Sequence, residues 1–367
     1  MKTVYANTIS PTSIRKIAKD GMTALDQCGG NTGNVCFVDA VKEQIAYSDD
    51  ISCYAIESYE DNALFVLPAS NWFNLDGHVL RDIFLPLETK NVQLLVIGLG
   101  IQLGLNDRID EFISEIIKNK GTIRALKILS EHSKIIGVRG NITGECLDKI
   151  GIHNWKVIGC PSFYEYYRHY GKKKIKKSSL SHVAINVTPG QFGEHRLIEY
   201  GIRTKCDYIL QAMSDMPLVL WESRPLEERH LQQKFPGIDN ISTIDVENYI
   251  KECGHIFYTR KDWSDYLLNN EVSFSIGSRF HGNMMAFTNG IPALWIMHDA
   301  RTRELIEAMN LPHIFYNEIK NCSMGEVMEK CEYNDLFYKI YYNMTKEYVK
   351  LLEMCGVKHY FRDDCND

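Results

Sequence analysis

The sequence lacks any apolar run approaching the roughly 20 residues that a membrane-spanning helix requires. Its first residues also lack the apolar core of a secretory signal. The formal net charge of −6 argues against duplex nucleic acid as the main partner. The eleven cysteines form no C-x-x-C pair, and an odd, widely scattered set fits free thiols better than a disulfide framework or a zinc site. We therefore expect a cytoplasmic protein without structural zinc.

Several catalytic signatures are also missing. The chain contains no G-x-S-x-G, H-E-x-x-H or Walker A sequence. A glycine-rich turn, Gly98–Gly104, follows the strand-like run Val92–Ile97, but its spacing is G-x-G-x-x-x-G, and no acidic residue ends a clear strand about 20 residues further on. We therefore reject NAD binding and interpret this turn as a sheet-edge turn that could line a ligand cleft.

What the chain does contain indicates two α/β domains. At 367 residues it is long for one domain, and 45% hydrophobic residues are enough for substantial cores. Short apolar runs alternate with helical segments, which is typical of parallel sheets buried on both faces. The runs expected to be strands are Ala63–Leu67, Val92–Ile97, Lys134–Val138, Lys156–Ile158, His182–Val187, Leu218–Trp221, Ile256–Tyr258, Val272–Ile276 and Ala293–Met297.

Changes of composition suggest where these domains meet. We expect a first domain over residues 1–170, a basic linker over 171–181 and a second domain over 182–330. The linker has a second interpretation, as a basic patch near an acidic membrane surface or an anionic polymer. Residues 331–367 form a tail in which apolar residues between Asn334 and Cys355 share one broad face, so we expect an amphipathic helix packing back on the domains.

Polar residues follow the strand expected at Val272–Ile276. The turn Gly277–Gly282 allows the backbone to bend tightly, and the helix that begins there offers free N–H groups to an anion. Ser278 is expected to cap this helix. His281 falls in its first turn, where a bound anion would favour the imidazolium. The alternative is a polar turn whose histidine bonds to a backbone carbonyl.

A second cationic turn follows one αβ unit later. Arg301 lies 20 residues beyond His281, after the strand expected at Ala293–Met297 and just after Asp299. Adjacent parallel strands place their C-terminal loops side by side, so both residues could reach one ligand. Arg279, His281 and Arg301 together suit a small, strongly anionic ligand. The alternative for Arg301 is a surface arginine opening a helix.

Three further candidates lie in the first half. Arg139 ends the strand expected at Lys134–Val138, where it either binds a ligand or serves as a cap or ion-pair partner. The glycine-rich turn Cys28–Asn34 opens a helix, and its glycines imply close ligand approach or unusual backbone geometry. Asn71 precedes Trp72, a residue that either stacks on a sugar ring or belongs to the core.

These motifs, in this order, resemble the polysaccharide pyruvyl transferase family. Ser278-Arg279-Phe280-His281-Gly282 resembles its signature, and the continuation through Gly290-Ile291-Pro292 reaches Arg301, where the family typically has Lys. The turn Asn31–Asn34 and the region from Arg139 to Ser162 match upstream motifs, so the resemblance spans roughly residues 29–312 of the chain. Ser162 stands where an Asp is common. A glycine turn usual after the third strand is replaced near Ala69-Ser70-Asn71.

The resemblance implies an α/β fold of two tandem Rossmann-like, GT-B-like domains with the active site in the cleft between them. The donor would be phosphoenolpyruvate, and the acceptor a sugar of a cell-surface polysaccharide or of its precursor, lipid-linked or free. The product would carry a pyruvate ketal, with no cofactor or metal required. The second domain would hold the donor and the first the acceptor. A lipid-linked acceptor would place the protein at the inner face of the membrane.

The resemblance also implies roles for single residues. His281 would be the general acid, Arg139 and Arg301 would hold the carboxylate and phosphate from opposite walls, and Asp299 is a weak candidate for the base. The substrate-binding residues would be Arg279, Ser278, Gly282, Asn31, Gly33, Asn34, Gly98, Asn71 and Asp299. Two alternatives stay open, a nucleotide-sugar glycosyltransferase of similar architecture and a non-catalytic glycan-binding homologue.

Overall fold

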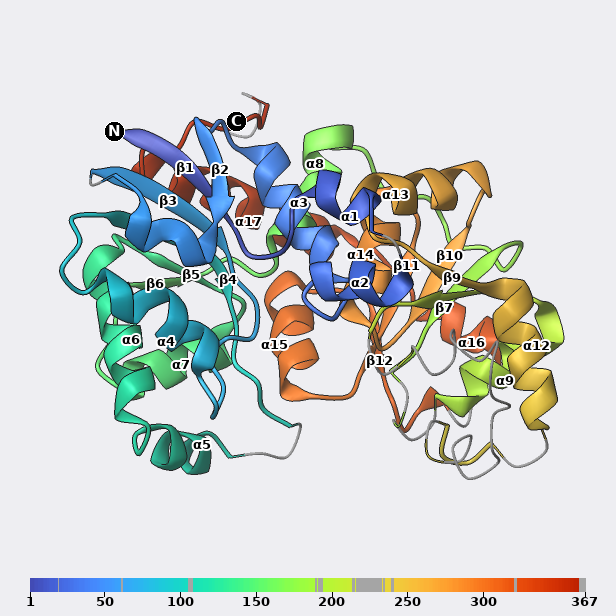
Figure 1. Ribbon diagram of the computed structural model, residues 1–367. Helices are drawn as coiled ribbons and strands as arrows, with labels where there is room; N and C mark the ends of the chain where they lie inside the picture. The colour runs from blue at the N-terminus through green and yellow to red at the C-terminus, as the bar shows by residue number, and fades with distance from the viewer. Residues whose placement is uncertain are drawn as a thin grey trace.

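The computed structural model describes residues 1–18, 20–60, 62–104, 108–188, 190, 194–212, 215, 233, 235–238, 241–319 and 322–362. Over these residues the chain forms two six-stranded sheets, each flanked by helices (Figure 1). All strand pairs within both sheets are parallel. Two such α/β domains facing each other are a GT-B-like arrangement, which confirms the expected fold class.

The first sheet has the order β2-β1-β3-β4-β5-β6. Its strands are β1 (Lys2–Asn7), β2 (Asp49–Ser52), β3 (Ala63–Pro68), β4 (Gln93–Leu99), β5 (Ile136–Val138) and β6 (Trp155–Val157). Every residue of β3 is buried, as expected for a central strand covered by helices on both faces. The helices of this part are α1 (Thr12–Lys16), α2 (Gly21–Gln27), α3 (Asn34–Gln44), α4 (His78–Phe84), α5 (Ile109–Ile116), α6 (Lys120–His132), α7 (Asn141–Lys149) and α8 (Glu165–Tyr170), with 3₁₀ turns at Cys53–Ser58, Leu85–Leu87 and Pro161–Tyr164.

The second sheet has the order β12-β11-β10-β7-β8-β9. Its strands are β7 (Val183–Asn186), β8 (Asp207–Leu210), β9 (Gly254–Ile256), β10 (Phe274–Gly277), β11 (Ala293–Met297) and β12 (His313–Phe315). The helices are α9 (His195–Thr204), α12 (Thr243–Cys253), α13 (Arg260–Asn269), α14 (Phe280–Thr288), α15 (Ala300–Met309) and α16 (Met324–Glu329). The strands β10 and β11 are direct neighbours, so the two cationic turns that follow them lie side by side.

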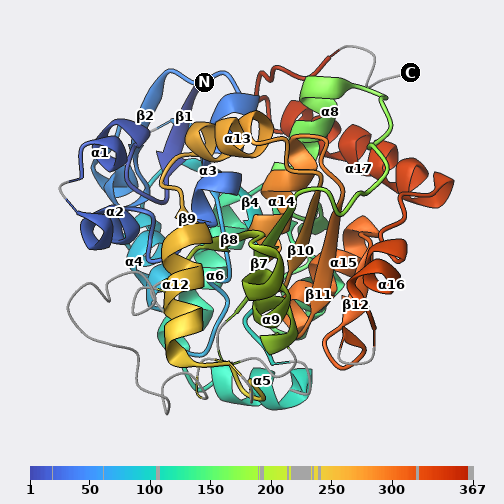
Figure 2. The same cartoon turned by 90° about the vertical axis from the view of Figure 1, so that its right-hand side faces the viewer.

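The tail forms a long helix, α17 (Asp335–Met354), capped at its start by Asn334. Its buried face contacts elements of both halves of the chain (Figure 2). The Tyr348 hydroxyl donates to Gln44 Oε1 over 2.8 Å, and the Tyr341 ring meets the Phe163 ring edge-on at 4.7 Å. Phe163 stacks in turn on Phe287 of α14. The helix therefore ties the two domains together at the back of the cleft.

The predicted apolar runs mark eight of the observed strands to within a few residues, and the run Leu218–Trp221 lies outside the described residues. Sequence analysis missed β1, β2, β8 and β12. Two of these, β2 and β12, are sheet edges with alternating exposed residues, so they lack a continuous apolar run. The remaining misses, β1 and β8, carry polar residues at their ends, which shorten the continuous apolar run.

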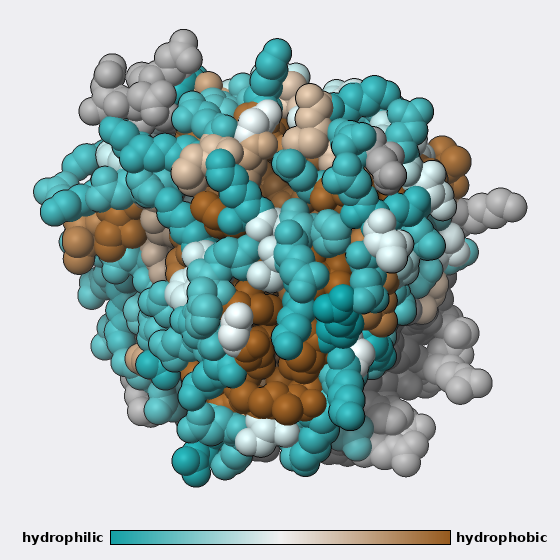
Figure 3. Space-filling model, turned by 90° about the vertical axis from the view of Figure 1, so that its left-hand side faces the viewer, coloured by the Kyte–Doolittle hydropathy of each residue, from teal (hydrophilic) through white to brown (hydrophobic). Residues whose placement is uncertain are grey.

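The protein surface is predominantly polar on the face shown in Figure 3, with hydrophobic side chains gathered near its lower centre. None of the helices that the structure describes combines the length and apolar character needed to cross a bilayer. The segment 171–181 contains neither helix nor strand, and its lysines are exposed. The ten cysteines in the described part of the chain are free thiols, as predicted.

Candidate active site

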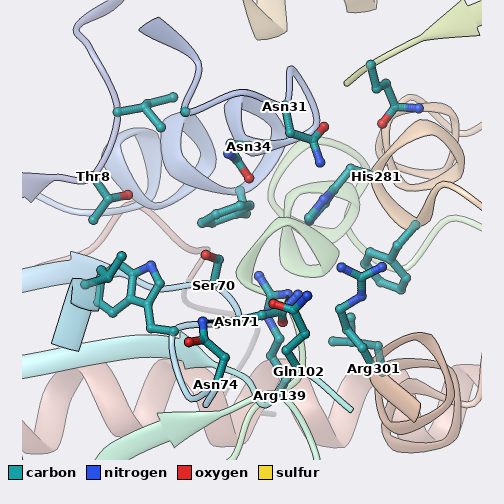
Figure 4. Close-up of a pocket in the computed structure, with 18 of the residues that line it drawn as sticks. Thr8, Asn31, Asn34, Ser70, Asn71, Asn74, Gln102, Arg139, His281 and Arg301 are labelled. Atoms are coloured by element: carbon teal, nitrogen blue, oxygen red, sulfur yellow. Dashed lines mark hydrogen bonds between the residues drawn. The ribbon is translucent and has the colours of Figure 1, made fainter. Parts of the chain in front are cut away.

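A cavity of about 570 Å³ opens between the two sheets (Figure 4). Most of its lining comes from the segments that follow the carboxyl ends of β1, β2, β3, β4, β5, β7, β8, β10 and β11. Open parallel sheets bind ligands at this edge, and here both sheets contribute to one cavity. The lining includes three arginines, Arg139, Arg279 and Arg301, and two histidines, His78 and His281. Among the described lining residues none is acidic, so the arginines are the strongly charged groups that the lining presents to a ligand.

Arg139 is held in place by backbone oxygens from two strand ends. Its Nε donates to Gly98 O over 2.9 Å, and an Nη donates to Ala69 O. The other Nη donates to Asn71 Oδ1 over 2.9 Å. Arg139 is only 3% exposed, and burial lowers the pKa of its guanidinium. Arginine nevertheless stays charged in proteins, so these contacts aim a desolvated cation at the cleft.

His281 occupies the first turn of α14, as predicted, and lies between the two domains. Its ring stacks on Phe37 of α3 with 5.2 Å between ring centroids. Its Nε2 lies 3.4 Å from the Sγ of Cys160, which belongs to the first domain. An added Cβ at Gly33 would lie 3.1 Å from His281 Cβ, so a glycine there lets α3 and α14 approach closely. The imidazole is thus packed from three sides.

The ligand-free cleft keeps His281 neutral. Burial lowers the pKa of His281 well below its ordinary value, and the charges of Arg139 and Arg301 lower it further. The predicted imidazolium therefore depends on a bound anion, which would oppose both arginines and raise the pKa. An anion and a proton should accordingly bind to this site together.

Arg301 stands at the start of α15 in the second domain and lines the same cavity as Arg139. Its Nη2 lies 2.9 Å from Asp299 Oδ2, and its side chain is 36% exposed. Asp299 is the N-cap of α15 and forms a reciprocal capping box with Thr302. Burial alone would raise the pKa of Asp299, but Arg301, His298 and Thr302 outweigh burial and lower it. Asp299 is not among the described lining residues, so its observed contacts orient Arg301 and do not reach into the cavity.

Arg279 and Ser278 are fixed by contacts within the second domain. Arg279 Nε donates to Val187 O over 3.1 Å, and its Nη2 lies 3.0 Å from Asp215 Oδ1. Ser278 does not cap α14, contrary to the prediction, because the N-cap is Arg279 and receives no side-chain bond. The Ser278 hydroxyl instead donates to Thr188 Oγ1 over 2.8 Å, which leaves the first N–H groups of α14 without a side-chain cap.

The other predicted glycines and asparagines shape the cavity walls. Gly98 has a φ of 84°, which favours glycine, and Gly282 has no room for a Cβ because Gln211 Nε2 would lie 2.6 Å away. Asn31 and Asn34 line the cavity, whereas Gly33, Gly98 and Gly282 are not in its described lining. Asn31 Oδ1 accepts from the Gly33 amide over 2.9 Å, which stabilises the turn.

The end of the cavity away from His281 and Arg301 has a different chemistry. Figure 4 shows Thr8 and Asn74 on the side of the cavity away from His281 and Arg301. The lining also includes Trp72, which is 7% exposed, and Tyr54, which is 58% exposed. Hydroxyls, an amide and aromatic faces are the groups that bind neutral polyols.

Sequence analysis missed several lining residues. Thr8, Tyr54, Asn74, Gln102 and Gln211 follow strand ends or lie in turns, and a complete list of predicted strands would have pointed to most of them. The contact between His281 and Cys160 joins residues far apart in the sequence, and no local pattern signals it.

A family model described as "Polysaccharide pyruvyl transferase" matches residues 14–300. Among curated proteins, none matches the chain. Solved structures with similar folds include a putative UDP-N-acetylglucosamine 2-epimerase from Listeria monocytogenes, with 11% identity, 96% of each chain covered and a TM-score of 0.42. Another UDP-N-acetylglucosamine 2-epimerase has 10% identity, 97% of this chain and 96% of that chain covered, and a TM-score of 0.41. S. aureus MnaA in a co-structure with UDP has 12% identity, 96% and 98% coverage, and a TM-score of 0.39.

Proposed function

The chain belongs to the polysaccharide pyruvyl transferase family, and we propose that its cleft moves the enolpyruvyl group of phosphoenolpyruvate onto a saccharide, forming a pyruvate ketal and releasing phosphate. One observation carries the donor assignment. Cations from both domains, Arg139 and Arg301 among them, line one cavity in which no described lining residue is acidic. A ligand with a carboxylate and a phosphate offers these cations an anionic group at each of two points.

We place phosphoenolpyruvate at the end of the cavity that the arginines line. The start of α14 offers backbone N–H groups without a side-chain cap, a site suited to a phosphate. Arg139, fixed by Gly98 and Asn71, suits a planar carboxylate or phosphate edge, and Arg301 faces it from the second domain. Either arginine can take either group, and both together hold the donor across the cleft.

The chemistry then requires one proton donor. Binding of the donor raises the pKa of His281, and the imidazolium gives its proton to the methylene carbon, which becomes a methyl group. A sugar hydroxyl attacks the resulting oxocarbenium carbon. The carbon–oxygen bond to phosphate breaks, and a second hydroxyl of the same sugar closes the ketal ring. Of the two hydroxyl protons released, one leaves with the phosphate and the other restores the imidazolium.

The acceptor would occupy the neutral end of the cavity. Trp72 and Tyr54 offer aromatic faces to a sugar ring, while Thr8 and Asn74 offer hydrogen-bonding groups to its hydroxyls. The combined volume of about 570 Å³ accommodates the donor and one sugar at once. The basic segment 171–181, expected first as a linker, would in its second interpretation contact an acidic membrane surface that carries a lipid-linked acceptor. The free thiols suit a cytoplasmic site of action.

Mass spectrometry of candidate acceptor glycans, incubated with the protein and phosphoenolpyruvate, tests the proposal. We expect the mass gain of one pyruvate ketal and release of phosphate that requires the acceptor. His281→Gln should lower the rate by about 10²- to 10⁴-fold. His153→Gln, a substitution at an exposed histidine with 72% side-chain exposure, should have no effect. Turnover of a nucleotide sugar instead, or full activity in His281→Gln, would overturn the proposal.

A further inference from the structure

We propose that Cys160 is a positioning residue for His281, holding the Nε2 edge of the imidazole so that Nδ1 presents the transferable proton to the ligand. The proposal rests on the proposed function for its catalytic consequence. Its structural content, the tautomer of His281, is independent of any activity. Cys160 follows β6 and belongs to the first domain, whereas His281 belongs to the second, so the contact also crosses the cleft.

The geometry assigns one edge of the ring to the protein and the other to the cavity. Cys160 is fully buried, and its Sγ lies 3.4 Å from His281 Nε2. One face of the ring stacks on Phe37. His281 lines the cavity, and within the described part of the chain no hydrogen bond is recorded for its Nδ1. The nitrogen available to a ligand is therefore Nδ1.

Both partners are neutral in the ligand-free protein, so this contact joins a thiol to a neutral imidazole. Burial raises the pKa of the Cys160 thiol despite the nearby charge of Arg139, and the same burial lowers the pKa of His281. A neutral imidazole carries its proton on one nitrogen and accepts at the other. In the proposed arrangement the thiol donates to Nε2, which leaves the ring proton on Nδ1.

Ser162 extends this arrangement by one step. Its Oγ lies 3.0 Å from Cys160 Sγ, and the side chain is fully buried. A hydroxyl that donates to the sulfur leaves the thiol hydrogen for His281. When an anion binds and His281 takes up a second proton, that proton sits on Nε2, and the sulfur serves as its weak acceptor. Nδ1 faces the ligand in both states.

Nitrogen-15 NMR of the full chain labelled at histidine tests the tautomer directly. The His281 signals are assigned by their loss in His281→Gln. In the ligand-free protein we expect Nδ1 protonated and Nε2 unprotonated. Cys160→Ser, which keeps a donor, should preserve this pattern, and Cys160→Ala should shift it toward protonated Nε2. Protonated Nε2 in the unsubstituted protein, or an unchanged pattern in Cys160→Ala, would overturn the proposal.

Kinetics separate positioning from mere packing. Cys160→Ala should lower kcat by about 10- to 100-fold, because a misplaced donor nitrogen loses its alignment with the methylene carbon. The KM for phosphoenolpyruvate should change little, since the arginines that bind it remain. Cys160→Ser should recover most of kcat, and Cys253→Ala, at a buried thiol outside the cavity lining, should match the unsubstituted protein. If no form of the protein transfers pyruvate, the proposed function fails, while the tautomer assignment stands or falls on the NMR result.

Discussion

The charge of His281 depends on its burial and on the charged groups near it in the cleft. In the free protein its pKa lies well below the ordinary value, because burial and then Arg139 and Arg301 disfavour the imidazolium. The sign of this shift means that His281 is neutral at pH 7. A bound multiply charged anion reverses the electrostatic contribution and raises the pKa. Ligand binding and protonation are therefore linked at this residue.

This linkage predicts that binding of phosphoenolpyruvate takes up a proton near pH 7. Isothermal titration calorimetry in two buffers of different ionisation enthalpy measures the number of protons directly. His281→Gln provides the control, because protonation of the ligand's own phosphate persists in that variant. We expect a smaller uptake in His281→Gln than in the unsubstituted protein. Equal uptake in the two proteins would show that His281 does not change its charge.

The place of Arg139 depends on Gly100, a glycine outside the described lining of the cavity. A Cβ at Gly100 would lie 2.7 Å from Arg139 Cδ and 2.8 Å from Asn71 Oδ1. We expect Gly100→Ala to push the guanidinium off its carbonyl partners and to raise the KM for phosphoenolpyruvate by about tenfold or more, with little change in melting temperature. Gly325→Ala is the matched control, since its nearest neighbour would lie at 3.9 Å. An unchanged KM in Gly100→Ala would argue against a donor-binding role for Arg139.

Site residues were predictable from the sequence where they follow a recognisable apolar run. Arg139, His281 and Arg301 each follow an apolar run, so the sequence places them at strand ends. Asn71, predicted as a ligand contact, lines the cavity, and its amide oxygen accepts from Arg139. Cys160 emerged only from the folded chain, because its partner lies 121 positions away.

At the scale of elements, helices α7 and α15 connect the two arginines. Glu304 of α15 accepts from the Thr143 amide over 3.0 Å and from its hydroxyl over 2.8 Å, near the start of α7. The helix α7 follows Arg139 directly, and α15 carries Arg301. A buried carboxylate thus joins the two cationic walls. Burial raises the pKa of Glu304 to about 7, and its bonds to Thr143 only partly oppose that rise.

A raised pKa for this acid predicts the pH dependence of stability. The folded protein holds the Glu304 proton more tightly than the unfolded chain. The protonated carboxyl group therefore stabilises the fold fully at pH values below the ordinary pKa of a glutamate, and this stabilisation is lost as pH rises through about 7. Glu304→Gln removes this contribution. We expect the difference in unfolding free energy between the two proteins to change by up to about 3 kcal/mol between pH 4.5 and 8. The stability of Glu304→Gln should rise relative to that of the unsubstituted protein as the pH rises. Urea unfolding at several pH values measures it, and a constant difference would contradict the assignment.

Whole elements were predictable to the extent that burial is uniform. Strands such as β3, buried along their full length, appear in the sequence as continuous apolar runs. In edge strands such as β2 and β12, exposed residues alternate with less exposed ones. These strands span only three or four positions, which is too short for an alternating pattern to be recognised in the sequence. The long tail helix was visible because 20 residues give its apolar face several turns to repeat.

At the scale of the molecule, an ionic cluster on the far side of the shared core holds the domains in register. Glu165 of α8 is fully buried and lies 2.7 Å from Arg260 of the second domain and 2.7 Å from Arg168. Gln44 donates to its other oxygen over 2.9 Å. Burial would raise the pKa of Glu165, but Arg260, His169 and Arg168 outweigh it and hold the pKa far below the ordinary value. No sequence pattern joins these residues, since they come from α3, α8 and α13.

Removing this one negative charge should destabilise the arrangement of both domains. Glu165→Gln keeps the shape of the side chain but leaves Arg260, which is only 7% exposed, without its closest buried counter-charge. We expect a loss of about 3 kcal/mol in unfolding free energy, measured by urea denaturation, because removing one partner of a buried ion pair is strongly unfavourable even though the exposed Glu43 still pairs with Arg260. Glu329→Gln, at an exposed glutamate of α16, should change the unfolding free energy by less than about 0.5 kcal/mol.

The depressed pKa of Glu165 also predicts how this difference depends on pH. The ionised carboxylate stabilises the fold at any pH above its ordinary pKa, and the stabilisation is lost as pH falls toward the pKa of Glu165 in the folded protein. The difference in unfolding free energy between Glu165→Gln and the unsubstituted protein should therefore become smaller in acid. A variant as stable as the unsubstituted protein at pH 7 would show that the remaining contacts, α17 foremost, hold the two domains together without this cluster.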